Sequence, residues 1–202
     1  MNCVELSLQE LREISIDAAK KIAKEVNIDL IVYVARAGLP IAIYMNEIFQ
    51  IDLLGISAQR KGNKLKSFLG PIISHMPSLM RNLLITLELK TKVHKHDTER
   101  NISFHASIKD ICIEKYKNIL IVDDSVDTGN SLVAVLAETQ QMFKNSQIYT
   151  YGLNVWDESK KIIKTDFYSY ENTIIKAPMS KDSKEYKLFC ELYKKMSQDD
   201  YI

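Results

Sequence analysis

Hydrophobic and polar residues follow two recurring patterns along this chain. Short runs of consecutive apolar residues are typical of strands buried on both faces of a parallel sheet. Longer stretches with an apolar residue at every third or fourth position are typical of helices that cover such a sheet. Because the two patterns alternate, we expect an α/β fold with a central, mostly parallel sheet flanked by helices. The predicted strands span 30–35, 53–57, 119–122 and 147–156, and the predicted helices span 8–27, 40–49 and 132–143.

Two parts of the chain are less regular. Residues 64–118 predict an insertion with one amphipathic helix over 78–92. Such a helix packs on the domain or on a subunit partner, or it lies on a membrane surface. We expect packing, and therefore no membrane contact. After Trp156 the pattern predicts a C-terminal flap and a last helix, with short strands over 162–164, 167–170 and 173–176 and the helix over 183–196.

Length and composition narrow the class of protein. A chain of 202 residues suits a single domain, residues 1–202, with an insertion at about 64–118. The net charge of +1 gives no reason to expect nucleic-acid binding. The three cysteines lie far apart without metal-ligand spacing, as is typical of reduced thiols. We find neither a signal-peptide pattern nor an apolar stretch of membrane-spanning length, so we expect a cytoplasmic protein.

The most informative segment is ILIVDDSVDTGNSL, residues 119–132. A buried strand runs into two adjacent carboxylates, Asp123 and Asp124, and a turn of small residues, 128–131, leads into a helix. In an open α/β sheet, ligands bind at the carboxyl ends of strands. Hydroxyls and N–H groups at a helix N-terminus suit a phosphate, whereas carboxylates suit sugar hydroxyls, Mg²⁺ or a proton to be moved. The segment therefore predicts a site for a phosphorylated sugar brought in with magnesium.

A purely structural interpretation of this segment is also possible. Hydroxyl side chains such as Thr128 and Ser131 could cap the helix, and aspartates favour a helix N-terminus. Capping uses only one or two such residues, however. Three aspartates within five positions, Asp123, Asp124 and Asp127, repel one another. We therefore favour a functional site, because clustered like charges are typical of one.

A second strand–loop–helix unit carries Arg36, Ala37 and Gly38 directly after the strand over 30–35. Arginine offers several donors for phosphate oxygens, and small residues let backbone N–H groups approach. The next strand is followed by Arg60 and Lys61, which either meet the same phosphates or form a solvated charged loop. The ends of neighbouring parallel strands meet at one edge of a sheet, so we expect the two loops to share a site.

The run VDDSVDTGNS, residues 122–131, resembles the phosphoribosyl-pyrophosphate (PRPP) motif of type I phosphoribosyltransferases, two acidic residues before a D-T-G-x-S/T loop. The Arg36 loop is similar to that family's R-G-G pyrophosphate loop. The late elements 166–168 (DFY) and 177–178 (AP) are similar to its xanthine–guanine and hypoxanthine branch. The resemblance covers most of 28–178. It implies an enzyme of nucleotide salvage that transfers the phosphoribosyl group of PRPP to a nitrogenous base, a purine, and releases pyrophosphate.

The resemblance also implies roles for individual residues. Asp123 and Asp124 hold the ribose hydroxyls, directly or through a magnesium ion, and Asp127 is the catalytic residue that shares a proton with the incoming base. The 64–118 insertion acts as a hood over PRPP, and a homodimer or another homo-oligomer is expected. The substrate-binding residues implied are Arg36, Ala37, Gly38, Arg60, Lys61, Asp123, Asp124, Ser125, Val126, Asp127, Thr128, Gly129, Asn130, Ser131 and Trp156.

The sequence departs from the family pattern at three places. Ala37 replaces the first glycine of the pyrophosphate loop. Trp156 stands near the position of a lysine that meets the purine's exocyclic oxygen, and aliphatic residues 174–175 replace a stacking aromatic residue. These differences leave open a non-catalytic protein of the same fold that senses PRPP or nucleotides. An assembly protein whose working surface is the 64–118 insertion is a further alternative.

Overall fold

The structure is a computed structural model that describes residues 3–60, 100–104 and 113–196. The chain divides into two compact units, 1–58 with 102–202 and 59–101. The strands are β1 (Cys3–Glu5), β2 (Leu30–Val34), β3 (Asp52–Arg60), β4 (Arg100–Phe104), β5 (Asn118–Val126), β6 (Gln147–Val155), β7 (Phe167–Glu171) and β8 (Ile174–Lys176). The helices are α1 (Leu8–Glu25), α2 (Gly38–Phe49), the 3-10 turn η2 (Ile113–Lys115), α5 (Asn130–Met142), α6 (Asp157–Lys160) and α7 (Tyr186–Met196).

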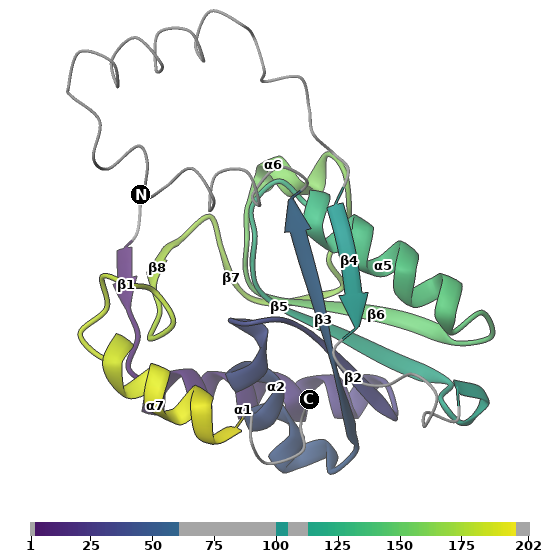
Figure 1. The fold of residues 1–202 in the computed structure, drawn as a ribbon, viewed down its shortest axis with the longest axis horizontal. Coiled ribbons are helices and arrows are strands. Elements are labelled where there is room, and N and C mark those ends of the chain that lie inside the picture. Colours follow the sequence, from purple (N-terminus) through teal and green to yellow (C-terminus); the bar gives the residue numbers. More distant parts are fainter. Residues whose placement is uncertain (1–2, 61–99, 105–112, 197–202) are drawn as a thin grey trace, which may run out of the picture. The chain divides into compact units, whose positions relative to one another are not determined.

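A six-stranded sheet in the order β4-β3-β2-β5-β6-β7 organises the fold (Figure 1). The pairs β2–β3, β2–β5, β5–β6 and β6–β7 are all parallel. Strands β1 and β8 form a separate parallel pair. The predicted α/β class with a mostly parallel sheet is therefore confirmed.

The central strands are buried on both faces because helices cover each face. Successive side chains of a strand point to opposite sides. Tyr33 of β2 and Val122 of β5 belong to the core cluster that α1 and α2 complete. Their neighbours Val32 and Ile121 belong to a second cluster, completed by α5. Helices α2 and α5 thus leave neighbouring strands toward opposite faces of the sheet, as Figure 1 shows.

Two aspartates tie the amino ends of the strands together. The carboxylate of Asp29 accepts hydrogen bonds of 2.8 and 3.1 Å from the backbone N–H groups of residues 117–118, next to the start of β5. Asp52 accepts hydrogen bonds of 2.7 Å from the Lys115 ammonium and 2.6 Å from the Tyr116 hydroxyl. These bonds support the register in which Leu30 pairs with Ile119.

Several predicted boundaries are wrong. The strand predicted over 119–122 continues to Val126, and the helix predicted from 132 begins at Asn130. No strand forms over 162–164, where the chain turns after α6 instead. Strand β4 was not predicted at all. The helix predicted over 78–92 lies outside the described residues.

Candidate active site

The acidic pair lies within the carboxyl-terminal part of β5 rather than after it. The sequence interpretation ended this strand at Val122, but pairing with β6 continues through the register Asp123 with Gly152 and Ser125 with Asn154. The run of consecutive apolar residues ends at Val122, but hydrogen bonding between parallel strands depends on the backbone and not on side-chain polarity. As a consequence Asp123 is only 5% exposed, while Asp124 is half-buried.

Burial makes both carboxyl groups weaker acids than an ordinary aspartate. Burial, and then the neighbouring charge of Asp124, raise the pKa of Asp123 well above its ordinary value. Burial likewise raises the pKa of Asp124. A hydrogen bond of 2.9 Å from the Asp124 N–H to Asp123 Oδ1 offsets only part of this cost. The pair is therefore suited to a partner that supplies hydroxyl donors or positive charge.

The turn after β5 opens helix α5 without a side-chain cap. Gly129 is the N-cap residue and adopts φ 79°, a left-handed conformation that favours glycine. No side chain forms a cap hydrogen bond at this helix in the described chain. Instead the Asn130 amide donates to Thr128 Oγ1 at 3.2 Å, and Ser125 Oγ donates to Asp127 Oδ1 at 2.5 Å. The capping interpretation is therefore wrong, and the first N–H groups of α5 remain available for an anion.

The Arg36 loop lies beside the acidic pair because of one close backbone contact. A Cβ atom on Gly38 would stand 2.8 Å from the carbonyl oxygen of Val122, the residue before Asp123. Only glycine lets the start of α2 approach β5 this closely. Ala37 adopts φ −75° and ψ −24°, an ordinary right-handed helical conformation, so an alanine fits where the family pattern has glycine. The peptide bond that precedes Arg36 is cis.

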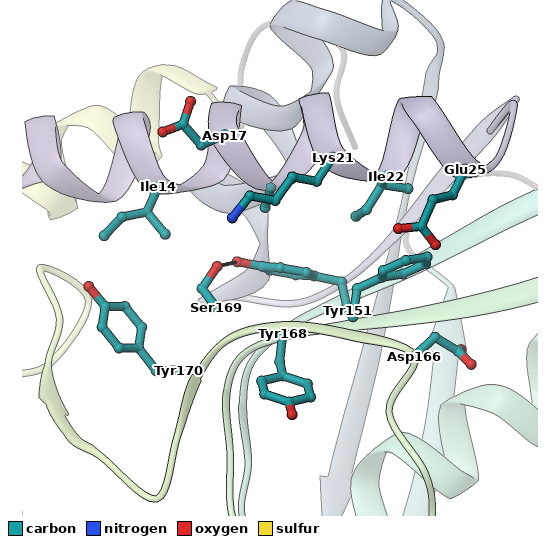
Figure 2. Close-up of a pocket in the computed structure, with 12 residues that line it drawn as sticks. Ile14, Asp17, Lys21, Ile22, Glu25, Tyr151, Asp166, Tyr168, Ser169 and Tyr170 are labelled. Atoms are coloured by element: carbon teal, nitrogen blue, oxygen red, sulfur yellow. Dashed lines mark hydrogen bonds between the residues drawn. The ribbon is translucent and has the colours of Figure 1, made fainter.

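A cavity of about 480 Å³ lies elsewhere, between α1 and β7. In Figure 2, Lys21 of α1 extends toward the hydroxyl groups of Tyr151 and Ser169, whereas Asp17 turns away. The two hydroxyl groups share a hydrogen bond of 2.7 Å. Among the described residues that line this cavity, none belongs to the predicted substrate-binding set.

A smaller cavity of about 200 Å³ adjoins the acidic segment. Asp124, Ser125 and Asp127 line this cavity together with Trp156. Sequence reasoning missed Asn154, whose buried amide donates to the Thr173 carbonyl oxygen at 2.9 Å. The only available signal is its place on β6, where Asn154 pairs with Ser125, two positions after Asp123. The cavity is completed by Leu153, Asn154, Thr173, Ile174, Ile175, Ala177 and Ser180.

Comparison with known proteins identifies the family. A family model described as "Phosphoribosyl transferase domain" matches residues 6–140. The chain belongs to this family. It is therefore a phosphoribosyltransferase, an enzyme of the glycosyltransferase class. No curated protein sequence matches the chain.

Solved structures of phosphoribosyltransferases share the fold. A purine phosphoribosyltransferase from Pyrococcus horikoshii OT3 is 21% identical, with 90% of this chain and 95% of that chain covered and a TM-score of 0.58. The Helicobacter pylori xanthine-guanine-hypoxanthine phosphoribosyltransferase is 20% identical, with 91% and 97% covered and a TM-score of 0.60. A hypothetical protein from Neisseria gonorrhoeae with bound ppGpp is 11% identical, with 95% and 97% covered and a TM-score of 0.56. The predicted type I phosphoribosyltransferase fold is thus confirmed.

Not every predicted site residue of this phosphoribosyltransferase can be placed. Arg60 ends β3, and Lys61 lies outside the described residues. Residues 123–131 and 36–38 meet at the carboxyl ends of β5 and β2. Among the described helices, none is both long and apolar enough to cross a membrane.

Proposed function

We propose that this phosphoribosyltransferase transfers the phosphoribosyl group of PRPP to a nitrogenous base, a purine, and releases pyrophosphate. One observation carries the proposal. An arginine loop and a buried acidic pair, followed by an uncapped helix N-terminus, stand at the carboxyl ends of the adjacent parallel strands β2 and β5. These groups match the chemistry of pyrophosphate, ribose hydroxyls and a 5′-phosphate, in that order.

Each group then has one task. Arg36, with Ala37 and Gly38, holds the pyrophosphate, and Arg60 and Lys61 act at the same end of the substrate. Asp123 and Asp124 hold the ribose hydroxyls. The segment 128–131 binds the 5′-phosphate with its N–H and hydroxyl groups. Val126 is buried in the core cluster that includes Leu132 of α5, so it supports the loop from within rather than contacting the substrate.

The reaction exchanges one bond at the ribose C1 for another. The bond from C1 to the pyrophosphate oxygen breaks, and its electron pair leaves with pyrophosphate, while a nitrogen of the base forms the new bond. Positive charge builds up on the ribose ring, so positioning and electrostatics are the main contributions of the protein. The nearby carboxylates stabilise that charge, and exposed Asp127 accepts or shares the proton of the base.

The site suits a magnesium ion brought in by the substrate. Among the described residues, no group of three or more histidine, cysteine, aspartate or glutamate side chains could hold a metal ion. Mg²⁺ commonly takes one or two carboxylates together with substrate oxygens and water. Asp123 and Asp124, whose burial and mutual repulsion favour added positive charge, fit this donor set. When bound, the ion would neutralise charge on the pyrophosphate and on the carboxylates.

The cavity beside Asp124 supports a flat heterocycle as acceptor. Trp156, Ile174 and Ile175 give it apolar walls, and Asp127 and Ser125 give it polar ones. An apolar slot with a few convergent polar groups suits a purine. Use of magnesium, homo-oligomer formation and a cytoplasmic location remain predictions.

Calorimetric titration of PRPP with magnesium, followed by pyrophosphate release with a panel of purines and other bases, tests the proposal. We expect binding and release with at least one purine. Asp123→Asn/Asp124→Asn should abolish release, whereas Asp17→Asn/Glu25→Gln on α1 should leave it unchanged. Near-normal release by the first double variant would refute the proposal. PRPP binding without release under any base would instead favour a sensor.

A further inference from the structure

The C-terminal helix α7 carries a row of three aromatic side chains, Tyr186, Phe189 and Tyr193. Spacings of three and four residues place them on one side of the helix. Neighbouring ring centroids lie 6.2 Å apart for Tyr186 and Phe189 and 5.8 Å apart for Phe189 and Tyr193. Because Phe189 is only 3% exposed, this row faces the core of the first unit rather than solvent.

Contacts near both ends of α7 fix its position. Glu185, just before the helix, accepts a hydrogen bond of 2.6 Å from the N–H of Leu8, the first residue of α1. Toward the other end, Tyr193 packs against the core cluster that contains Tyr33 of β2. Since β2 leads directly into the Arg36 loop, α7 brings the Tyr193 ring to the arginine assigned above to pyrophosphate.

The Arg36 guanidinium lies over that ring, with its Cζ atom 5.0 Å from the ring centroid. This distance is within the range of about 6 Å for a favourable cation–π contact. We propose that Tyr193 is a positioning residue that holds Arg36 ready for the pyrophosphate group of PRPP. The inference rests on the proposed function.

A ring is a suitable support for this purpose. The attraction acts between the charge and the face of the ring, so it uses none of the five N–H donors that the guanidinium needs for phosphate oxygens. Arg36 is exposed, and among the described residues it has no carboxylate partner that would compete for those donors. A long side chain that is already ordered before binding also loses less conformational freedom when the substrate arrives.

The helix that supplies this support lies outside residues 6–140, the part of the chain that the family model matches. The contact is therefore made by a segment that the family model does not match. The opposite effect of the same contact would be stacking that keeps Arg36 away from the substrate. The two effects change PRPP affinity in opposite directions, so one measurement separates them.

The test compares four residues at position 193 in the full chain, with calorimetric Kd for PRPP and magnesium and steady-state kinetics as readouts. Tyr193→Leu should raise the Kd and the KM for PRPP about two- to fivefold, the worth of an exposed cation–π contact. Tyr193→Phe and Tyr193→Trp, which keep a ring, should bind within about twofold of wild type. The KM for the base should stay unchanged. Tyr168→Leu, the same substitution at an exposed tyrosine of β7, should change none of these values.

A double-mutant cycle with Arg36→Gln shows whether Tyr193 acts through the arginine. In the Arg36→Gln background, Tyr193→Leu should have no further effect on PRPP binding. If Tyr193→Leu lowers the Tm, comparison of the Phe and Trp variants with wild type still tests the ring. Three outcomes would overturn the inference: equal PRPP affinity for all four residues, tighter PRPP binding by Tyr193→Leu, or additive effects in the cycle. The proposed function would still stand in each case if Arg36→Gln weakens PRPP binding. A wild-type chain that does not bind PRPP would overturn the proposed function and this inference together.

Discussion

Replacing Asp123 by asparagine should stabilise the folded protein while it weakens the site. Asp123 is 5% exposed, so water screens its charge little, and Asp124 lies next to it. An asparagine keeps the Oδ1 acceptor of the 2.9 Å hydrogen bond from the Asp124 N–H and removes the buried negative charge. The substitution is therefore nearly isosteric and acts mainly through electrostatics.

The size of the effect follows from linkage between protonation and folding. Burial and the neighbouring carboxylate raise the pKa of Asp123, and a raised carboxyl pKa lowers the free energy of unfolding at a pH above it, on the order of 1.4 kcal/mol for a tenfold weaker acid. Part of the gain is lost because the new amide group must find an acceptor. We expect a net stabilisation of about 1–2 kcal/mol near neutral pH, which corresponds to a rise in Tm of roughly 2–8 °C.

Thermal unfolding followed by circular dichroism, in EDTA and without ligand, measures this difference. Because the pKa of Asp123 is raised in the folded state, its cost is full above that pKa and absent below the unfolded value of about 3.9. The Tm advantage of Asp123→Asn should therefore shrink as the pH falls toward about 4. Asp127→Asn at an exposed position should change stability by no more than about 0.5 kcal/mol. A lower Tm for Asp123→Asn at neutral pH, or a difference independent of pH, would refute the reasoning.

Three further substitutions test the packing around the site and the base of the sheet. Gly38→Ala should cost about 1–3 kcal/mol and weaken PRPP binding, because its Cβ would meet the Val122 carbonyl oxygen at 2.8 Å; unchanged melting and calorimetry would contradict this. Gly129→Ala should lower the free energy of unfolding by at least about 1–2 kcal/mol, because its φ of 79° strains an alanine. Adding Ile163→Ala should recover only the part of that loss due to the 2.8 Å contact between the new Cβ and Ile163. Full recovery would exclude backbone strain. Asp52→Asn should lower stability by about 0.2–1 kcal/mol at pH 7, because hydrogen bonds from two side chains lower the pKa of this exposed carboxyl group. That loss should begin to shrink only as the pH falls below about 4, the unfolded pKa, and should disappear once the pH is below the lowered folded pKa, which melting curves over this acid range check.

The sequence was sufficient for the fold class and for the acidic segment, because both depend on local patterns. Consecutive apolar residues identified β2 and β5, and an acidic pair before a small-residue turn indicated the candidate site. The end of β5 could not be predicted, because Asp123 continues the strand through backbone pairing with Gly152 on a strand that is distant in sequence. The same is true of Asn154, whose place in the cavity follows from that register.

Contacts between side chains that meet only in the folded chain could not be predicted from the sequence either. The amphipathic pattern of the last helix predicted packing and nothing more, yet Tyr193 lies under the guanidinium of Arg36. A position 157 residues later in the chain offers no local signal for such a contact. Conversely, the replacement of a glycine by Ala37 needs no unusual backbone conformation, because the backbone there adopts an ordinary right-handed helical conformation.

The location of the site follows from the path of the chain through the sheet. From β2 the chain continues through α2 to β3 on one side, whereas from β5 it continues through α5 to β6 on the other. Helices α2 and α5 cover opposite faces, so the carboxyl ends of β2 and β5 are left open between them. Ligands of open α/β sheets bind at such a switch point. Under the proposed function neither loop alone holds PRPP, and the close approach of Gly38 to Val122 brings the two loops together. For this reason we expect Gly38→Ala to reduce PRPP affinity even though its side chain would touch no substrate.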